Sequence, residues 1–310
     1  MFDRILVPLD GSREAEAVFP PLRRLLRRKD AEVILFQAVN LPVAVPFDHA
    51  GAVLSGLESD ATAYLGEQRA RLESEGAQVR THVESGRSAD AILRAAEAHQ
   101  ASLIAMSTHG RSGFVRWMLG SITEDVMRRS RIPVFVAHSN PPAIGTDLQT
   151  LRTILVPFDG SEESLSAAPP ALELARLFEA SIAVLRVEEG APGGPDLGFV
   201  GLKMDGPSSL EGRPDLLDRD LIDAGNRFAR EGVPTTLFRA RGDTASKINH
   251  LARILPAVAI VMATHGRQGV SRLITGSVAE EVVRKAETPV LVNRIGADVA
   301  VPALQERRVS

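Results

Sequence analysis

The chain of 310 residues contains no cysteine, one tryptophan and one tyrosine, and 4% of its residues are aromatic. The lack of cysteine excludes a disulfide scaffold, thiol catalysis and cysteine-ligated metal. No uninterrupted apolar run approaches the roughly 18 residues that suggest a membrane-spanning helix, so we expect no membrane association. A net charge of −3 gives no overall attraction to nucleic acid. The first residues, MFDRILVPLDGS, are typical of a buried strand rather than a signal peptide, and we expect a cytoplasmic protein.

What the chain does contain is an internal repeat, which decides its organisation. ILVPLDGS at 5–12 returns as ILVPFDGS at 154–161, an offset of 149 residues. THGRSG at 108–113 returns as THGRQG at 264–269, an offset of 156 residues. With 44% hydrophobic and 24% charged residues, each copy can build a core of its own. We therefore expect two domains, at 1–140 and 151–295.

The two offsets differ by seven residues, so the second copy carries an insertion between its two repeated blocks. The stretch 189–214 is rich in glycine and proline, and we expect the insertion there as a loop. The stretch 139–151, SNPPAIGTDLQTL, is rich in turn formers and is expected to link the domains.

Strand-like and helix-like segments alternate within each copy. Helical patterns lie at 13–28 and 88–99, where Ser88 is expected to be the N-cap. Between the helical patterns are short apolar runs typical of strands buried on both faces. In the first copy these runs are 4–9, 33–39, 79–83, 102–107 and 133–137. This alternation predicts an α/β fold, with a doubly wound parallel five-stranded sheet in each copy.

Paired prolines lie within expected helices at matching places in both copies, although proline is disfavoured inside a helix. Pro20-Pro21 and Pro169-Pro170 fall within the first helical segment of each domain. An interior proline costs about 3 kcal/mol because it removes a hydrogen bond and clashes with the preceding turn. We expect these helices to be kinked, or to have irregular first turns.

A ligand site is expected where the winding of the sheet reverses, at the carboxyl ends of the first and fourth strands. In the common order 3-2-1-4-5 these ends carry Asp10 and the turn Thr108-His109-Gly110, with Asp159 and the turn at 264–266 in the second copy. Glycines after the fourth strand let the backbone approach a ligand, and a helix that opens there offers free N–H groups to phosphate. The residues proposed for phosphate are Gly110, Arg111, Gly113, Arg116, Gly120 and Ser121, with Gly266, Arg267, Gly269, Arg272, Gly276 and Ser277 in the second copy.

Purely structural roles compete with each of these assignments. Ser121 and Glu124 have the spacing of a capping box, as do Ser277 and Glu280. The aspartates that end the first strands are also common as turn or cap residues. His109 and His265 have no nucleophile arrangement around them, so we favour a role in ordering the turn.

These residues together resemble the universal stress protein family, and both copies carry the pattern. The pattern begins with Val-Pro, then Leu or Phe, then Asp-Gly-Ser. Further along each copy come Thr-His-Gly, nine residues, Gly-Ser, and later a strand that begins with Pro-Val. The resemblance implies a Rossmann-like fold of the adenine nucleotide alpha hydrolase type, in a tandem arrangement. It also implies ATP as ligand with Mg or Mn, and either a homodimer or an intrachain pseudo-dimer formed through the last strands.

The resemblance also implies which residues meet the nucleotide. The aspartates would contact ribose, and the backbone at Ala38 or Val187 would read adenine. Ser107 and Ala263 stand in place of the first motif glycine. The remaining residues assigned to the nucleotide are Met106, His109, Ile122, Met262, His265 and Val278.

Three functions remain open. The first is a nucleotide-dependent stress-response or signalling module. The second is an enzyme such as a slow ATPase, although the sequence has neither a Walker lysine loop nor a pyrophosphatase loop after the first strand. The third is an interaction protein that keeps the fold and has lost the nucleotide. We expect the first, with adenine nucleotide as partner, no catalytic residues and no nucleic acid.

Overall fold

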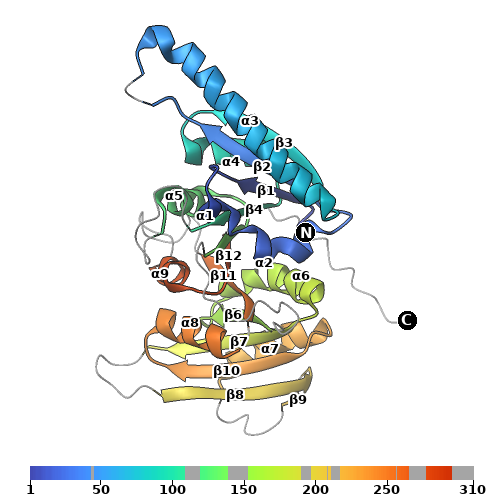
Figure 1. Cartoon of the computed structure of the whole chain (residues 1–310). Coiled ribbons are helices and arrows are strands. Elements are labelled where there is room, and N and C mark those ends of the chain that lie inside the picture. Colours follow the sequence, from blue (N-terminus) through green and yellow to red (C-terminus); the bar gives the residue numbers. More distant parts are fainter. Residues whose placement is uncertain are drawn as a thin grey trace.

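The computed structural model describes residues 1–42, 45–108, 119–138, 153–189, 197–207, 209–210, 217–255, 257–264 and 277–294. Two α/β halves join edge to edge in one 12-stranded sheet, with helices on both faces (Figure 1). Within the described part, no helix is both long and apolar enough to cross a membrane.

The first half contains the predicted five strands in the predicted order. They run parallel in the order β3-β2-β1-β4-β5. Their bounds are β1 Arg4–Pro8, β2 Glu32–Val39, β3 Gln78–Ser85, β4 Leu103–Ser107 and β5 Val134–Ala137. β1 and β4 are neighbours at the centre, so the winding reverses between them as expected.

The second half repeats this topology. Its five parallel strands stand in the order β10-β7-β6-β11-β12. If these strands are numbered one to five along the second copy, the order is again 3-2-1-4-5. Their bounds are β6 Thr153–Phe158, β7 Ser181–Glu188, β10 Thr235–Arg241, β11 Ala257–Thr264 and β12 Val290–Arg294. The prediction of two doubly wound sheets is confirmed.

The described part of the insertion, 197–207 and 209–210, is not the loop that its glycines suggested. It forms β8, Leu197–Gly206, and the short β9, Ser209–Leu210, which extend the sheet beyond β10 in antiparallel direction. Gly201 lies opposite Phe238, and a Cβ built on Gly201 would stand 2.7 Å from the phenyl ring. The glycine therefore makes room for an aromatic neighbour within a strand, where the composition alone suggested a turn.

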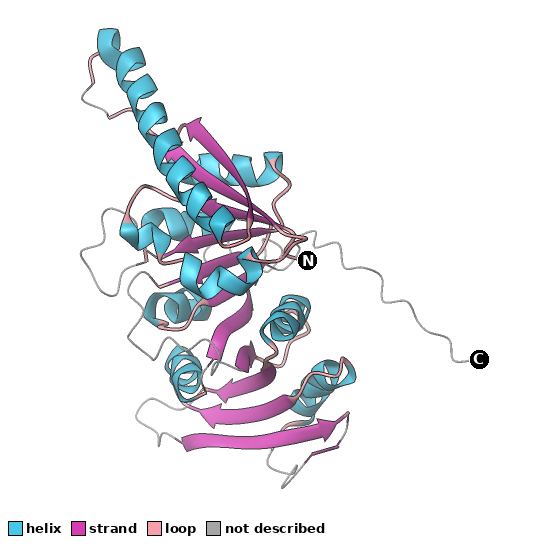
Figure 2. Cartoon of the chain, turned by 45° about the vertical axis from the view of Figure 1, so that its right-hand side comes forward, coloured by secondary structure: helices cyan, strands magenta, loops and turns pink. Residues whose placement is uncertain are grey.

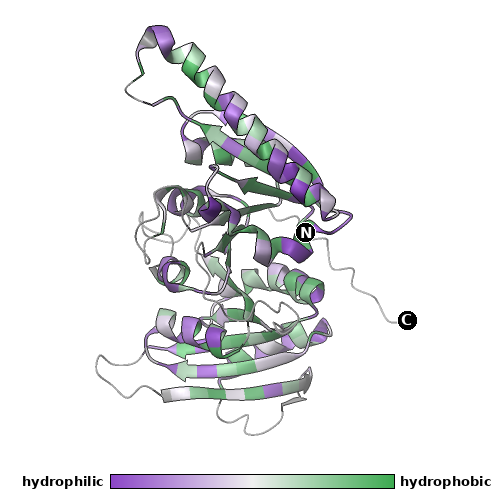
Figure 3. Cartoon of the chain, in the orientation of Figure 1, coloured by the Kyte–Doolittle hydropathy of each residue, from purple (hydrophilic) through white to green (hydrophobic). Residues whose placement is uncertain are grey.

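Helices cover the two faces of the sheet separately (Figure 2). One face packs against α1 Arg13–Glu16, α2 Phe19–Leu26, α3 Ala50–Ser74, α6 Ala168–Phe178 and α7 Arg219–Arg230. The opposite face packs against α4 Ser88–Ala98, α5 Ser121–Arg129, α8 Thr244–Ile254 and α9 Ser277–Lys285. The 3₁₀ turns η1, Phe47–His49, and η2, Ser164–Ala167, precede α3 and α6. Figure 3 shows hydrophobic strands between helices whose outer faces are hydrophilic.

The paired prolines are accommodated by irregular helix starts. The first helical segment divides into α1 and α2, and Pro20 is the second residue of α2. Pro169 is likewise the second residue of α6, after the 3₁₀ turn η2. At these positions the N–H that proline lacks would have no helical partner, so the cost is avoided. Ser88 is the first residue of α4 and Arg87 holds the cap position, so the predicted Ser88 cap is wrong by one residue.

The two halves meet through their last strands. β5 and β12 are antiparallel, with Phe135 opposite Leu291. The pairing therefore hides the edge of each five-stranded sheet inside the chain. The intrachain pseudo-dimer implied by the resemblance is therefore observed, and the homodimer stays a prediction.

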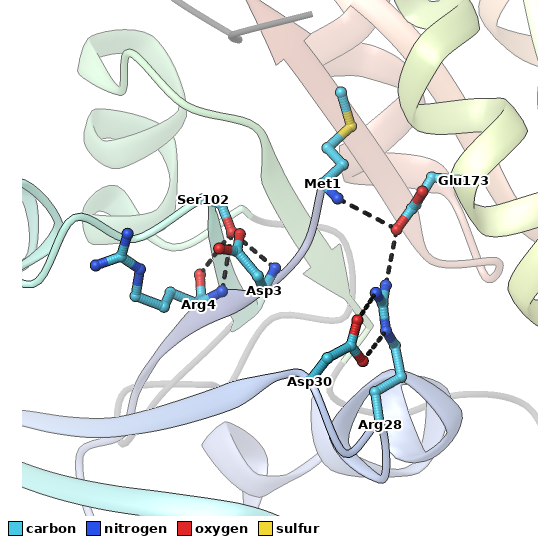
Figure 4. A network of polar contacts seen from close by, with 7 residues as sticks. All are labelled: Met1, Asp3, Arg4, Arg28, Asp30, Ser102 and Glu173. Atoms are coloured by element: carbon cyan, nitrogen blue, oxygen red, sulfur yellow. Dashed lines mark hydrogen bonds and ion pairs between the residues drawn. The ribbon is translucent and has the colours of Figure 1, made fainter. Parts of the chain in front are cut away.

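Polar contacts reinforce this join on the face that carries α2 and α6. Arg28, which follows α2, donates to Glu173 on α6 over 2.7 Å and also pairs with Asp30. The Met1 amino group lies 3.4 Å from the same Glu173 carboxylate (Figure 4). Burial raises the pKa of Glu173, but the hydrogen bond from Arg28 and the nearby positive charges outweigh it and lower that pKa overall.

Candidate functional site

The aspartate that ends the first strand of each copy organises a tight turn. Asp10 Oδ1 accepts from the backbone N–H of Ser12 at 3.0 Å and from its hydroxyl at 2.5 Å. Ser12 Oγ in turn caps α1 by accepting from Ala15 N–H at 3.1 Å. Asp159 and Ser161 repeat both contacts, at 2.9 and 2.5 Å. The turn role weighed for these aspartates is therefore present, and it holds each carboxylate at the strand end where a ribose contact was predicted.

The end of β4 is tied directly to the start of α5. Gly120 N–H donates to the Thr108 carbonyl at 2.8 Å, and Thr123 Oγ1 donates to the Ser107 carbonyl at 3.0 Å. Ser107, Thr108 and Thr123 are buried, so these bonds lie inside the domain. They place the amino-terminal turn of α5 beside the central strand ends, which is the placement a phosphate site requires.

The capping-box interpretation of Ser121 is wrong. Gly120 holds the N-cap position of α5, since its carbonyl accepts the first helical hydrogen bond from Glu124 N–H at 2.9 Å. Ser121 is already helical and exposed, and no side chain caps this helix end. The hydroxyl is therefore not used by the cap. In the second copy α9 begins at Ser277, whose side chain lies outside the described part.

A cavity of about 520 Å³ opens at this helix start. It lies between the end of β2 and the first turns of α4 and α5, and its lining includes the predicted residues Ser121 and Ile122. Ile122 is 43% exposed, and among the described residues only three other large apolar side chains are exposed. The volume lies within the roughly 300–1,000 Å³ of small-molecule sites.

Several residues of this cavity were missed from the sequence. Asn40 follows β2, and its amide donates to Ser88 Oγ at 3.2 Å, joining the end of β2 to the start of α4. The exposed Arg87 adds a positive charge to the rim. Asn40 corresponds to Glu189 in the second copy, so the repeat offered no signal for it. The only hint was its place just after the second strand.

The acidic residues of the cavity are largely neutralised by arginines. Asp90 pairs with Arg129 at 2.6 Å, and Asp125 pairs with both Arg128 and Arg129 at 2.9 Å. Burial raises the pKa of Asp125, but its hydrogen bonds to the two arginines outweigh burial and lower it. An anion at the helix start therefore meets fewer unpaired negative charges than the composition of the lining suggests.

The other predicted contacts divide between strand ends and undescribed loops. Ala38 and Val187 lie at matching places near the ends of β2 and β7. Met106 and Met262 are buried near the ends of β4 and β11, and Ala263 follows Met262. Val278 in α9 is partly buried against the core. Predicted residues outside the described part are His109, Gly110, Arg111, Gly113, Arg116, His265, Gly266, Arg267, Gly269, Arg272 and Gly276.

The described residues contain no group of three or more histidine, aspartate or glutamate side chains suited to hold a metal ion. The structure therefore offers, in the part it describes, no preformed set of protein ligands for a metal ion.

Comparisons with known proteins identify the family to which the chain belongs. The model of the universal stress protein family matches residues 1–138 and again 150–294. A universal stress protein of Methanocaldococcus jannaschii is 35% identical over 145 residues, 46% of this chain and 81% of that protein. One from Mycolicibacterium smegmatis is 25% identical over 300 residues, 94% of this chain and 96% of that protein.

Solved structures show the same fold over almost the whole chain. A universal stress protein from Archaeoglobus fulgidus superposes with a TM-score of 0.73 at 23% identity, covering 96% of this chain and all of that one. A putative universal stress protein from Pseudomonas aeruginosa superposes with a TM-score of 0.64 at 19% identity, covering 94% of this chain and 93% of that one. Because the family model matches almost the entire chain in two successive copies, this protein is a tandem member of the universal stress protein family.

Proposed function

We propose that this chain binds ATP at the strand ends of each domain and acts as a nucleotide-dependent stress-response or signalling module in the cytoplasm. Mg or Mn would arrive with the phosphates. The supporting observation is the junction of β4 with α5, where two hydrogen bonds hold a helix start beside a cavity of about 520 Å³. Backbone N–H groups at such a helix start favour phosphate.

Each part of the cleft suits one part of the nucleotide. The α5 start would take phosphate, and Asp10 would accept hydrogen bonds from ribose hydroxyls. The backbone near Ala38 would read the adenine edge, and the exposed Ile122 would pack on an apolar surface of the ligand. Binding would change the contacts that the chain offers to a partner, a shift between two states. The loops expected to respond, 107–120 and 263–276, lie mostly outside the described residues.

The decisive test fills the helix start. Gly120 has φ −61° and ψ 138°, a conformation open to any residue, so Gly120→Val adds volume without backbone strain. We expect Gly120→Val combined with Gly276→Val to abolish the heat of ATP–Mg binding in calorimetry and to leave the circular dichroism unchanged. Gly198→Val is the control, because Gly198 lies on β8 with no atom within 4 Å of a built Cβ. Normal binding by the double variant would refute the site.

Two further measurements separate the alternatives. Nucleotide released from the denatured protein and identified by chromatography would support the proposal directly. The absence of binding heat at near-millimolar ATP would favour an interaction protein that has lost the nucleotide. Phosphate release faster than about 1 s⁻¹, the low end for ordinary enzymes, would favour an ATPase instead.

A further inference from the structure

A second cavity, of about 430 Å³, lies among α1, α2 and the carboxyl-terminal half of α3. These helices cover the face of the sheet opposite to α4 and α5, so this cavity is separate from the candidate nucleotide cleft. Buried Phe19, Leu26 and Leu72 form apolar parts of its wall. Its charged lining consists of four arginines and two glutamates, an excess of two positive charges: Arg13, Arg23, Arg27, Arg71, Glu16 and Glu75.

The two glutamates are already engaged by neighbouring side chains. Glu16 accepts hydrogen bonds from Tyr64 at 3.1 Å, Gln68 at 3.2 Å and Arg71 at 3.1 Å. This carboxylate therefore has little capacity left for another donor.

The remaining arginines are under-neutralised. A single oxygen of Glu75 lies 3.1 Å from Arg27 and 3.4 Å from Arg23. Arg13 is exposed and makes no ion pair or side-chain hydrogen bond with the part of the chain that the structure describes. Each guanidinium carries five N–H donors, so the cleft has donors and positive charge to spare.

The second domain provides an internal comparison, because its corresponding charges cancel. Arg13 corresponds to Glu162, and Arg23 corresponds to Leu172. Arg227 is the counterpart of Arg71, and it pairs with Glu162 at 2.6 Å. The counterparts of Arg27 and Glu75 are Arg176 and Glu231, which pair at 2.7 Å. The positive excess is therefore a property of the first domain and not of the fold.

We infer that this arginine cleft binds a small organic anion, a phosphate or carboxylate joined to an apolar body. Guanidinium groups bind these anions through paired, charge-assisted hydrogen bonds. The apolar wall at Phe19 and Leu72 contacts the body of the ligand, and Arg71 already stacks 5.1 Å from the centre of the Phe19 ring. A volume of about 430 Å³ suits a small molecule. This site lies outside the proposed nucleotide function and does not depend on it.

The test uses phenyl phosphate, a phosphate on an apolar ring, titrated into the full chain by calorimetry. We expect one site per chain, with affinity that falls as salt rises and exceeds that for inorganic phosphate. Arg13→Glu with Arg23→Leu installs the residues of the second domain and should weaken binding at least tenfold. Arg230→Glu with Arg253→Leu makes the same change in net charge at exposed positions outside the cleft, and should leave binding unchanged.

Four outcomes would overturn the inference. The cleft variant could bind as tightly as the native chain, or the charge-matched control could lose binding equally. Loss in Gly120→Val/Gly276→Val, with retention in the cleft variant, would place the anion in the nucleotide clefts. Binding of a glutamate-rich peptide without binding of phenyl phosphate would indicate a surface for an acidic protein instead. Thermal unfolding of both double variants checks that each remains folded.

Discussion

Replacement of Gly225 by alanine tests how closely the inserted strand β8 is packed. Gly225 lies in α7, and a Cβ built on it would stand 2.4 Å from Leu237 Cδ2 and 2.7 Å from Met204 Sδ. Leu237 belongs to β10 and Met204 to β8, and both side chains are buried. Because both side chains are buried, the added methyl must shift Leu237, Met204 or the elements that carry them.

The expected magnitude is a balance of two effects. Alanine gains about 1 kcal/mol over glycine in a helix. Overpacking a closed core costs about 1–3 kcal/mol, and contacts this short favour the upper half of that range. We therefore expect Gly225→Ala to lower the free energy of unfolding by about 1–2 kcal/mol. Gly66→Ala in α3 is the matched control, because a Cβ there meets nothing within 4 Å, and it should stabilise by about 0.5–1 kcal/mol.

The assay is urea unfolding followed by circular dichroism, with midpoints of the three proteins compared under one condition. A Leu237→Ala background separates packing from helix propensity, since it removes the nearest atoms. In that background Gly225→Ala should become neutral or stabilising. If Gly225→Ala were as stabilising as Gly66→Ala in the native chain, the close contact of α7 with β10 and β8 would be refuted.

Three other perturbations have definite expected outcomes. The pKa of Glu173 is lowered in the folded state, so its stabilising contribution is fully present above about pH 4.5 and is lost as pH falls through the folded pKa. Glu173→Gln should lower the free energy of unfolding by about 1 kcal/mol at pH 7, where solvent screens the partly exposed pair with Arg28, and this loss should shrink in urea unfolding as the pH is lowered below 4.5. Thr123→Val removes the buried hydrogen bond to the Ser107 carbonyl, so it should lower the free energy of unfolding by about 1 kcal/mol and weaken ATP binding in calorimetry. Unchanged stability and unchanged binding would contradict the role of this bond in holding the start of α5. Burial and neighbouring basic side chains lower the pKa of His99, so stability falls as pH drops below about 6.5; His99→Gln should flatten the pH dependence of the urea midpoint between pH 7.5 and 5.5.

The sheet was predictable because buried parallel strands leave a strong local pattern. Short apolar runs with turn residues at each end marked all five strands of the first copy, and the repeat carried the assignment to the second. The insertion was not predictable in the same way. Glycine signals a loop in most contexts, and only the position of Phe238 across from Gly201 shows why this glycine belongs in a strand.

The candidate site was predictable only where it depends on strand ends. Asp10 and the start of α5 follow from topology, since parallel strands end at one edge of the sheet. The prediction that Ser121 caps α5 was wrong because helical hydrogen bonding begins one residue earlier, at Gly120. That difference places Ser121 inside the helix, where its side chain is not the cap. Asn40 and Arg87 could not be found from the sequence because the cavity forms where two separate loops approach in space.

The differences between the two copies separate what the fold requires from what one domain has acquired. Both copies keep the Asp–Ser turn, with distances that agree within 0.1 Å, because the turn starts the next helical segment in each. The arginine excess of the first cleft is not shared, since Glu162 and Leu172 fill its counterpart in the second domain without disturbing the helices. A like-charged cluster carries a repulsive cost that the fold does not need, and an anionic ligand is the component that would offset it.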